Sequence, residues 1–150
     1  MITYNLTFEG FKREAVKNSL PESSGLYFVY RGRRLLDRYG AYYCVLNELL
    51  YIGKAHNIRQ RVCGGHESFS DWESSLVGDE ILYYSSCLLP EVLEKDNLYL
   101  ERAEAACIFK AAPRFNDKQK GMFDFDKYGE VRILSEGRIA LMDKDFTLKH

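Results

Sequence analysis

Two short stretches, Gly25-Leu26-Tyr27 and Tyr51-Ile52-Gly53, carry the strongest fold signal in this chain. The first opens a run of apolar and aromatic residues that predicts a strand over 26–30. The second ends similar runs, which predict strand material over 41–45 and 49–52. If the two strands that carry the tyrosines pair with each other, the tyrosine rings lie close together at one face of the sheet.

Outward from these strands, the pattern predicts three helices. Apolar residues at helical spacing predict the first over 8–18. Asn57 is a plausible N-cap for a short helix over 58–63. Pro90 suits the first position of a long apolar helix that runs to about residue 112, where Pro113 ends it.

The remaining elements are a third strand over 80–89 and a hairpin in the tail, with strands over 131–134 and 138–142. Residues 67–78 are polar and loop-like, with Trp72 as a local anchor. The order of elements predicts an α+β fold, with a small three-stranded antiparallel sheet flanked by helices, an extra N-terminal helix and a C-terminal β-hairpin. The 150 residues suit a single domain, 1–150, with its own core.

Charge is balanced overall but unevenly placed. The net charge of −1 argues against a protein that binds nucleic acid through bulk charge alone. However, Arg31, Arg33, Arg34 and Arg38 form a basic cluster, whereas the stretch 67–80 carries acidic residues and no basic one. A balanced total can therefore hide a basic face opposite an acidic one.

The cysteines and the start of the chain bear on the compartment. The four cysteines are scattered and form no CxxC pair, which is typical of buried thiols in a reducing cytosol, so we expect a cytoplasmic protein. Residues 1–10 lack the pattern of a signal peptide, and the apolar stretches are too short for a membrane span. We therefore expect no membrane partner.

An arginine and a C-terminal motif follow the two tripeptides in order. Arg61 lies ten residues after Tyr51, and Glu104 precedes the segment Pro113-Arg114-Phe115-Asn116. Over residues 20–117 this ordered set resembles the GIY-YIG nuclease superfamily, whose members hydrolyse phosphodiester bonds with a single divalent metal. The resemblance implies a metal-dependent endonuclease acting on duplex or branched DNA and leaving a 5′-phosphate and a 3′-hydroxyl.

The resemblance also implies a role for each position. Tyr27 would be the general base, assisted by Tyr51. Arg61 would offset charge on the phosphoryl oxygens, a task that suits a permanently charged bidentate fork. Glu104 would hold Mg²⁺ or Mn²⁺, because one carboxylate together with waters and substrate phosphate is enough for such a cation. Asn116 would brace the site through hydrogen bonds of its amide.

Three further residues are candidates for substrate binding. Gly53 would allow a close approach of the backbone, and Lys54 would contact a phosphate. Arg59 lies two positions from Arg61 on the predicted helix and therefore faces elsewhere, toward a DNA strand. The link between the tripeptides is longer than the family's usual one, and its arginines make it a candidate substrate-binding insertion.

Several alternatives stay open. Glu101 lies one helical turn before Glu104 and is a second candidate for the metal ligand. His66 is one position off the family pattern, so it is either a partner that relays the proton of Tyr27 or a structural histidine. A non-catalytic or partner-activated nucleic-acid-binding module of the same fold is the rival function, and RNA is the rival substrate. A targeting protein partner, and either a monomer or a homodimer, would be compatible with the sequence.

Overall fold

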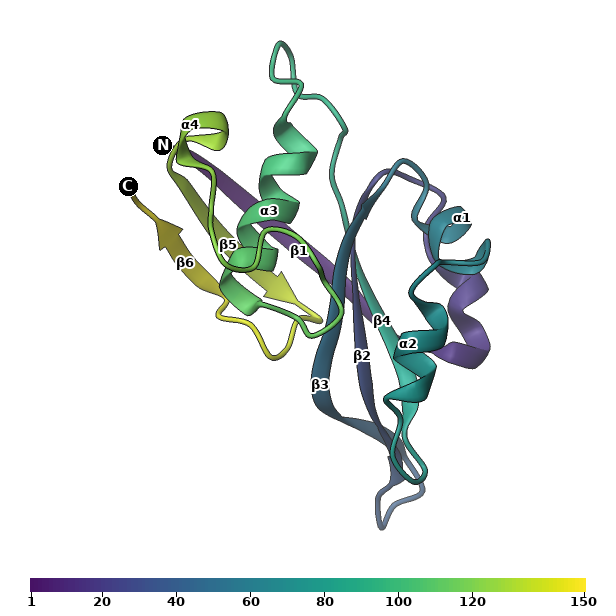
Figure 1. Ribbon diagram of the computed structural model, residues 1–150. Helices are drawn as coiled ribbons and strands as arrows, with labels where there is room; N and C mark the ends of the chain where they lie inside the picture. The colour runs from purple at the N-terminus through teal and green to yellow at the C-terminus, as the bar shows by residue number, and fades with distance from the viewer.

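A computed structural model describes all residues, 1–150, as one curled sheet of six strands with short helices on both faces (Figure 1). The sheet order is β3-β2-β4-β1-β5-β6, and only β1 and β5 are parallel neighbours. The strands are β1 (Ile2–Arg13), β2 (Gly25–Leu36), β3 (Tyr42–Ala55), β4 (Ile81–Leu88), β5 (Val131–Gly137) and β6 (Asp145–Leu148).

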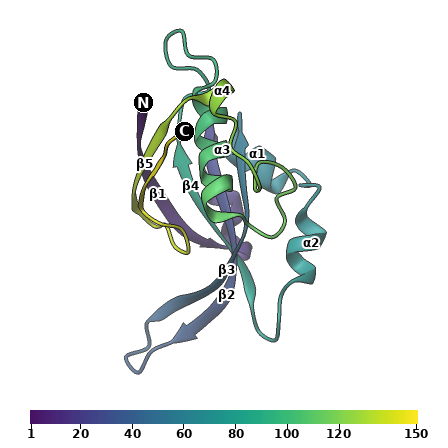
Figure 2. The ribbon, with the colours of Figure 1, turned by 60° about the vertical axis from the view of Figure 1, so that its left-hand side comes forward.

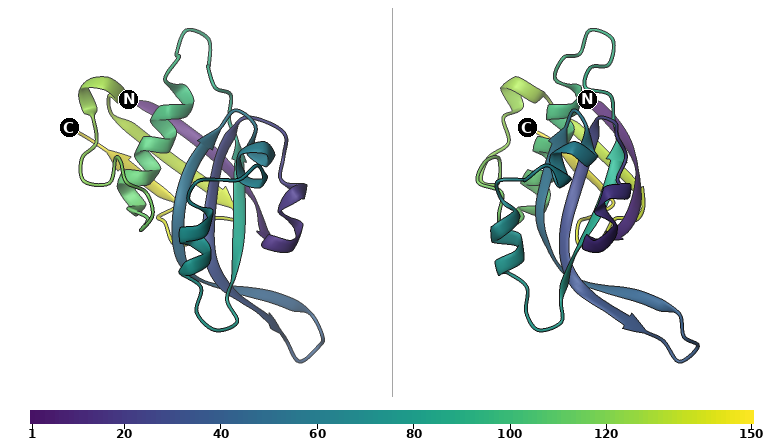
Figure 3. Two further views of the ribbon diagram at one scale, coloured as in Figure 1. Left: turned by 45° about the vertical axis from the view of Figure 1, so that its right-hand side comes forward. Right: turned by 90° about the vertical axis from the view of Figure 1, so that its right-hand side faces the viewer.

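The helices are short and lie in two layers. They are η1 (Glu14–Ser19), α1 (Ile58–Cys63), α2 (Phe69–Ser74), α3 (Tyr99–Ala111) and α4 (Phe125–Tyr128). The sheet curls around α3 on one side, while η1, α1 and α2 cover the other side of β2 and β4 (Figures 1 and 3). None of the helices combines the length and the apolar character needed to cross a membrane.

The alternation of side chains along β2 divides the core between these two layers. Leu26 and Phe28 belong to the larger buried cluster, which includes residues of α3. Tyr27 and Val29 belong to a smaller cluster with residues of α1 and α2. Successive side chains of a strand point to opposite faces, so β2 places Tyr27 on the α1 side.

The prediction of a small three-stranded antiparallel sheet is wrong. β2, β3 and β4 are antiparallel neighbours, but the sheet continues through β1, β5 and β6. The predicted N-terminal helix is wrong over 8–13, which belong to β1, and only its second half is helical, in η1. In β1, buried Tyr4, Leu6 and Phe8 alternate with exposed residues. This period of two, together with partner strands on both sides, outweighs the helical spacing that begins at Phe8.

Two other predicted elements have different bounds. The long helix begins at Tyr99, not at Pro90, because Glu94 has a left-handed φ of 55°. The second strand of the tail pair is β6, not 138–142, and Leu141 has a left-handed φ of 61°. The left-handed backbone at these two positions interrupts a regular element, and the spacing of apolar residues does not predict it.

The segment between β3 and β4 agrees partly with the prediction. α1 has the predicted bounds, and the Asn57 side chain accepts a hydrogen bond from the backbone N–H of Gln60 at 3.0 Å. Trp72 is fully buried, as expected of an anchor, but it lies on the helix α2 and not in a loop.

Candidate active site

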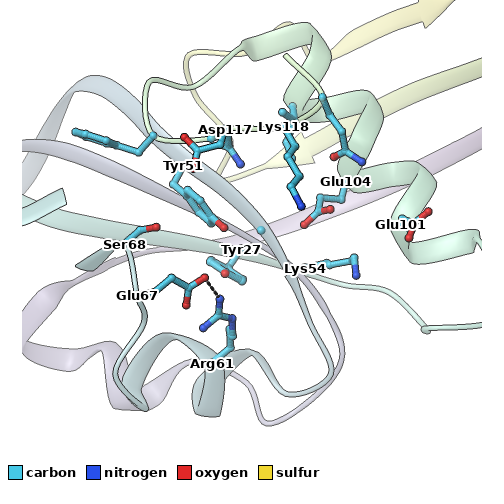
Figure 4. Close-up of a pocket in the computed structure, with 15 residues that line it drawn as sticks. Tyr27, Tyr51, Lys54, Arg61, Glu67, Ser68, Glu101, Glu104, Asp117 and Lys118 are labelled. Atoms are coloured by element: carbon cyan, nitrogen blue, oxygen red, sulfur yellow. Dashed lines mark hydrogen bonds and ion pairs between the residues drawn. The ribbon is translucent and has the colours of Figure 1, made fainter. Parts of the chain in front are cut away.

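A cavity of about 630 Å³ opens at the outer edge of β3, between α1 and α3 (Figure 4). Its walls come from β2, β3, α1, α3 and the segment after Pro113, which are far apart in the sequence. The predicted site residues that line it are Tyr27, Tyr51, Gly53, Lys54, Arg61, Glu104 and Asn116. The sheet and two helices thus bring these residues together.

Gly53 allows the Tyr27 side chain to reach this cavity. The two residues are direct partners in the β2–β3 ladder. A Cβ atom at Gly53 would overlap the ring and the hydroxyl of Tyr27. The absence of a side chain therefore lets the Tyr27 phenol pass over the backbone of the edge strand toward the cavity.

The Tyr27 phenol sits in an aromatic cluster. Its ring stacks with that of Tyr51 at a centroid distance of 6.0 Å, and the His66 ring packs edge-on to both. Trp72 lies behind, with its ring 4.4 Å from that of His66. Burial raises the pKa of Tyr27 well above its usual range, Tyr51 raises it further and Arg61 acts in the opposite direction.

His66 orients the Tyr27 phenol. The His66 Nδ1 accepts a hydrogen bond from the Ser68 backbone N–H at 3.0 Å, and its Nε2 lies 2.7 Å from the Tyr27 oxygen. Burial lowers the pKa of His66 to about 4, so the ring is neutral near pH 7. With Nδ1 accepting, the single ring proton is on Nε2 and is donated to the Tyr27 oxygen.

This tautomer leaves His66 without a free acceptor nitrogen. In this arrangement it cannot take a proton from Tyr27, and its contribution is to hold the phenol and to favour the phenolate form. The proton of the Tyr27 hydroxyl is then free to point away from His66. His66 itself does not line the cavity and is only 4% exposed.

Arg61 enters the cavity from α1 and is already paired there. One of its terminal nitrogens lies 2.5 Å from Oε1 of Glu67, and this pair is drawn in Figure 4. The Arg61 hydrogen bond lowers the pKa of Glu67 to about 2, so Glu67 is ionised near neutral pH. A phosphate that binds Arg61 must share it with Glu67 or displace that carboxylate.

Arg59 lies outside the cavity. Its Nε donates a hydrogen bond to the Leu20 carbonyl at 2.7 Å, and its guanidinium lies 3.6 Å from Glu22. These contacts hold the turn before β2 against α1. Of the three predicted substrate-binding residues, Gly53 and Lys54 line the cavity and Arg59 does not.

Glu104 and Glu101 both project from α3 toward the cavity but have different environments. The Tyr128 hydroxyl donates to Glu101 at 2.7 Å, Lys127 lies 2.9 Å from it, and together they lower its pKa. Burial instead raises the pKa of Glu104 to about 7, and only nearby Lys54 opposes this effect. Glu101 is thus occupied by partners, whereas Glu104 presents a desolvated carboxyl group.

Asn116 fastens the far wall of the cavity to the edge of β3. Its Oδ1 accepts from the Ile52 backbone N–H at 3.0 Å, and its Nδ2 donates to the Ile52 carbonyl at 2.8 Å. The neighbouring Phe115 N–H donates to the Leu50 carbonyl at 3.1 Å. The Asn116 amide is therefore used in bracing, and the following residues are placed over the cavity.

Several lining residues were not predicted from the sequence. Glu67 belongs to a stretch that reads as a solvated acidic loop, and nothing in that stretch indicates a partner for Arg61. The other such residues are Ser68, Ile108, Asp117, Lys118 and Gln119. Glu101, the predicted alternative to Glu104, also lines the cavity. Lys118 extends into the cavity in Figure 4 and adds a positive charge to this wall.

The donor set of the cavity can be tested against the needs of a hard cation. No group of three or more histidine, cysteine, aspartate or glutamate side chains could hold a metal ion. Glu104 supplies one carboxylate beside open space, and a Mg²⁺ ion can be held by one or two carboxylates with waters and a substrate phosphate. The residues therefore fit a cation that is bound together with a phosphate.

Comparisons with family models, with curated proteins and with solved structures found no match.

Proposed function

We propose that this protein is a divalent-metal-dependent endonuclease, with a site of the GIY-YIG type, that hydrolyses phosphodiester bonds in DNA. One observation supports the proposal above all: Tyr27, Arg61 and Glu104 come from three separate parts of the chain and line one cavity. A phosphodiester hydrolase needs a proton acceptor, a cation for the phosphoryl oxygens and a carboxylate for a metal. These three side chains supply one of each.

Glu104 would hold Mg²⁺ or Mn²⁺, and Arg61 would bind the scissile phosphate. When bound, such a cation would offset phosphoryl charge and lower the pKa of a nearby water. Arg61 suits phosphate because its planar fork can donate two hydrogen bonds and keeps its charge. Lys54 and Lys118 also line the cavity and add charge that favours the approach of a polyanion.

Tyr27 would accept the proton of the attacking water. Burial keeps this phenol protonated in the free protein, so the role requires loss of its proton when positive charge gathers in the cavity. The N–H donated by His66 and the charge of Arg61 both favour the phenolate. Water would give a proton to the Tyr27 phenolate and add to phosphorus, the bond to the 3′-oxygen would break, and that oxygen would take up a proton from solvent.

The products would be a 5′-phosphate and a 3′-hydroxyl, and one cavity would cut one strand at a time. Cleavage of both strands would then need a homodimer or two successive encounters. The protein has four free cysteines and no disulfide, which supports a reducing compartment such as the cytoplasm.

Nicking of supercoiled plasmid tests this function. We expect wild-type protein at low salt to nick the plasmid with Mg²⁺ or Mn²⁺ and not with EDTA. Glu104→Gln should lower the rate at least 100-fold, because a neutral amide holds a divalent cation poorly. Glu101→Gln is the matched control, one turn away on the same helix, and should keep most of the activity.

The result that overturns the proposal is an absence of cleavage of plasmid, branched and single-stranded DNA with either metal. Binding of DNA without cleavage would instead select the rival, a non-catalytic nucleic-acid-binding module. The Arg61–Glu67 pair favours that rival to some degree, because it occupies the arginine that a substrate would need.

A further inference from the structure

A second cavity, of about 560 Å³, lies at the base of the arm that β2 and β3 form. The arm projects well beyond the rest of the sheet (Figure 2). The walls of this cavity come from the end of β1, from β2, β3 and β4, and from Arg138 after β5. It shares no residue with the cavity around Glu104, and we call it the basic groove.

Four basic side chains line the basic groove and no acidic one does: Lys12, Arg13, Arg34 and Arg138. None of the four forms an ion pair, whereas seven other arginines do. Unpaired cations held side by side repel one another, and a bound anion relieves that repulsion. The groove is therefore a concentrated positive site on a chain whose net charge is −1.

A buried hydroxyl without a partner lies in the same groove. Tyr83 is 4% exposed, and its hydroxyl makes no hydrogen bond. Burial raises the pKa of Tyr83 and Cys44 raises it further, while the positive charges of Arg34 and Arg13 act in the opposite direction. An unsatisfied buried hydroxyl costs free energy in the free protein, and a ligand that reaches the floor of the groove would satisfy it.

Tyr42 on β3 gives the groove exposed aromatic surface. It is 61% exposed, a high value for a residue with a ring of this size. The Arg34 guanidinium lies 3.7 Å from the centroid of the Tyr42 ring. Aromatic rings beside unpaired arginines are the combination with which proteins bind single-stranded nucleic acid, in which phosphates contact the cations and bases stack on the rings.

We propose that the basic groove binds a single-stranded segment of nucleic acid. Phosphates would contact Arg34 and Arg138, a base would stack on Tyr42, and the Tyr83 hydroxyl would hydrogen-bond the bound strand. A duplex is less suitable, because its paired bases present no free face to a tyrosine ring. This inference does not depend on the nuclease proposal, since the groove and the Glu104 cavity share no residue.

Fluorescence anisotropy in EDTA, with a labelled 20-nucleotide single strand and the matching duplex, tests the proposal without cleavage. Arg34→Ala/Arg138→Ala should weaken single-strand binding at least tenfold and reduce its dependence on salt. Arg33→Ala/Arg132→Ala removes the same charge from two exposed, ion-paired arginines and should have less than a twofold effect. Tyr42→Ala should weaken binding about tenfold, which is within the range for loss of one stacked base.

Tyr83→Phe tests whether the Tyr83 hydroxyl contacts the bound strand or only contributes to the stability of the fold. It should weaken single-strand binding severalfold and leave thermal stability unchanged or higher, because it removes an unsatisfied hydroxyl. The proposal is overturned if both arginine pairs weaken binding equally, if the duplex binds as tightly as the single strand, or if poly-glutamate competes as well as DNA. Competition by a free mononucleotide at the same concentration would also overturn it in favour of a small-molecule site.

Discussion

The cavity around Glu104 and the basic groove handle charge in opposite ways. In the first, Arg61 pairs with Glu67, and Glu101 pairs with Lys127 at the rim. In the second, no carboxylate lines the wall and none of the four cations forms an ion pair. Paired charges hold side chains in fixed positions, which favours catalysis. Unpaired cations of one sign supply attraction without fixed geometry, which suits the capture of a polyanion.

Of the substitutions that test this difference between the two cavities, removal of Arg61 should have the largest effect. We expect Arg61→Ala to lower the rate of plasmid nicking by about 10²–10³-fold, the usual cost of losing one donor that stabilises developing charge. Arg59→Ala is the control on the same helix. It should leave nicking within twofold and cost about 1 kcal/mol of stability, because it deletes the bond to the Leu20 carbonyl. Equal losses of activity in both variants would contradict the placement of Arg61 in the site.

Gly53→Ala should have the next largest effect, on the geometry of the first cavity. The added methyl group overlaps the Tyr27 ring, so we expect a loss of about 2–3 kcal/mol in denaturant unfolding. The loss should fall below about 1 kcal/mol in a Tyr27→Ala background, since the ring is then absent. Gly121→Ala, where a Cβ meets nothing, should cost less than about 0.5 kcal/mol. A cost at Gly53 that is independent of Tyr27 would mean that the glycine serves the backbone alone.

Glu104→Gln should stabilise the protein in a way that depends on pH. The pKa of Glu104 is raised to about 7, above the value of about 4.3 of an unfolded chain, so the folded state loses stability as pH rises between these values. The variant has no such loss, and its advantage should grow from pH 4.5 to a plateau above pH 7, at about 1.4 kcal/mol for each unit by which the folded state raises the pKa. Unfolding in urea at pH 5 and pH 8 measures this. The same advantage at both pH values would mean that burial does not raise the pKa of this carboxyl group.

The sequence shows which residues meet at the first cavity better than it shows the fold around it. Local patterns were enough to predict the two tyrosine-bearing strands and the capped helix α1. Gly53, Arg61, Glu104 and Asn116 were assigned to one site only through the resemblance to a nuclease family. The sheet was misjudged because β1 reads as a strand only when Tyr4 and Leu6 are counted with Phe8, and because its pairing with β5 links the two ends of the chain. Such long-range pairing has no local signature.

The same limit explains the misjudged charges. Arg31, Arg33 and Arg34 form one cluster in the sequence, but alternation along β2 places Arg34 on the opposite face from Arg31 and Arg33. Arg31 pairs with Glu48 and Glu80, and Arg33 pairs with Asp79. Only Arg34 of these three enters the basic groove, beside Arg138 from the far end of the chain. A count of charges could not show which of them remain unpaired.

Glu67→Gln should leave Arg61 without an ion pair, as the cations of the basic groove are. Of the predicted effects, its effect on DNA binding should be the smallest. The substitution keeps the shape of the side chain but frees Arg61, so we expect duplex DNA in EDTA to bind about threefold more tightly at low salt. The gain is small because an exposed ion pair is worth at most about 1 kcal/mol, and it should vanish at high salt. Asp79→Asn is matched, since Asp79 and Glu67 are both 67% exposed and each pairs with an arginine. Equal gains in both variants would assign the effect to net charge, whereas weaker binding in Glu67→Gln would mean that this carboxylate holds Arg61 in its binding position.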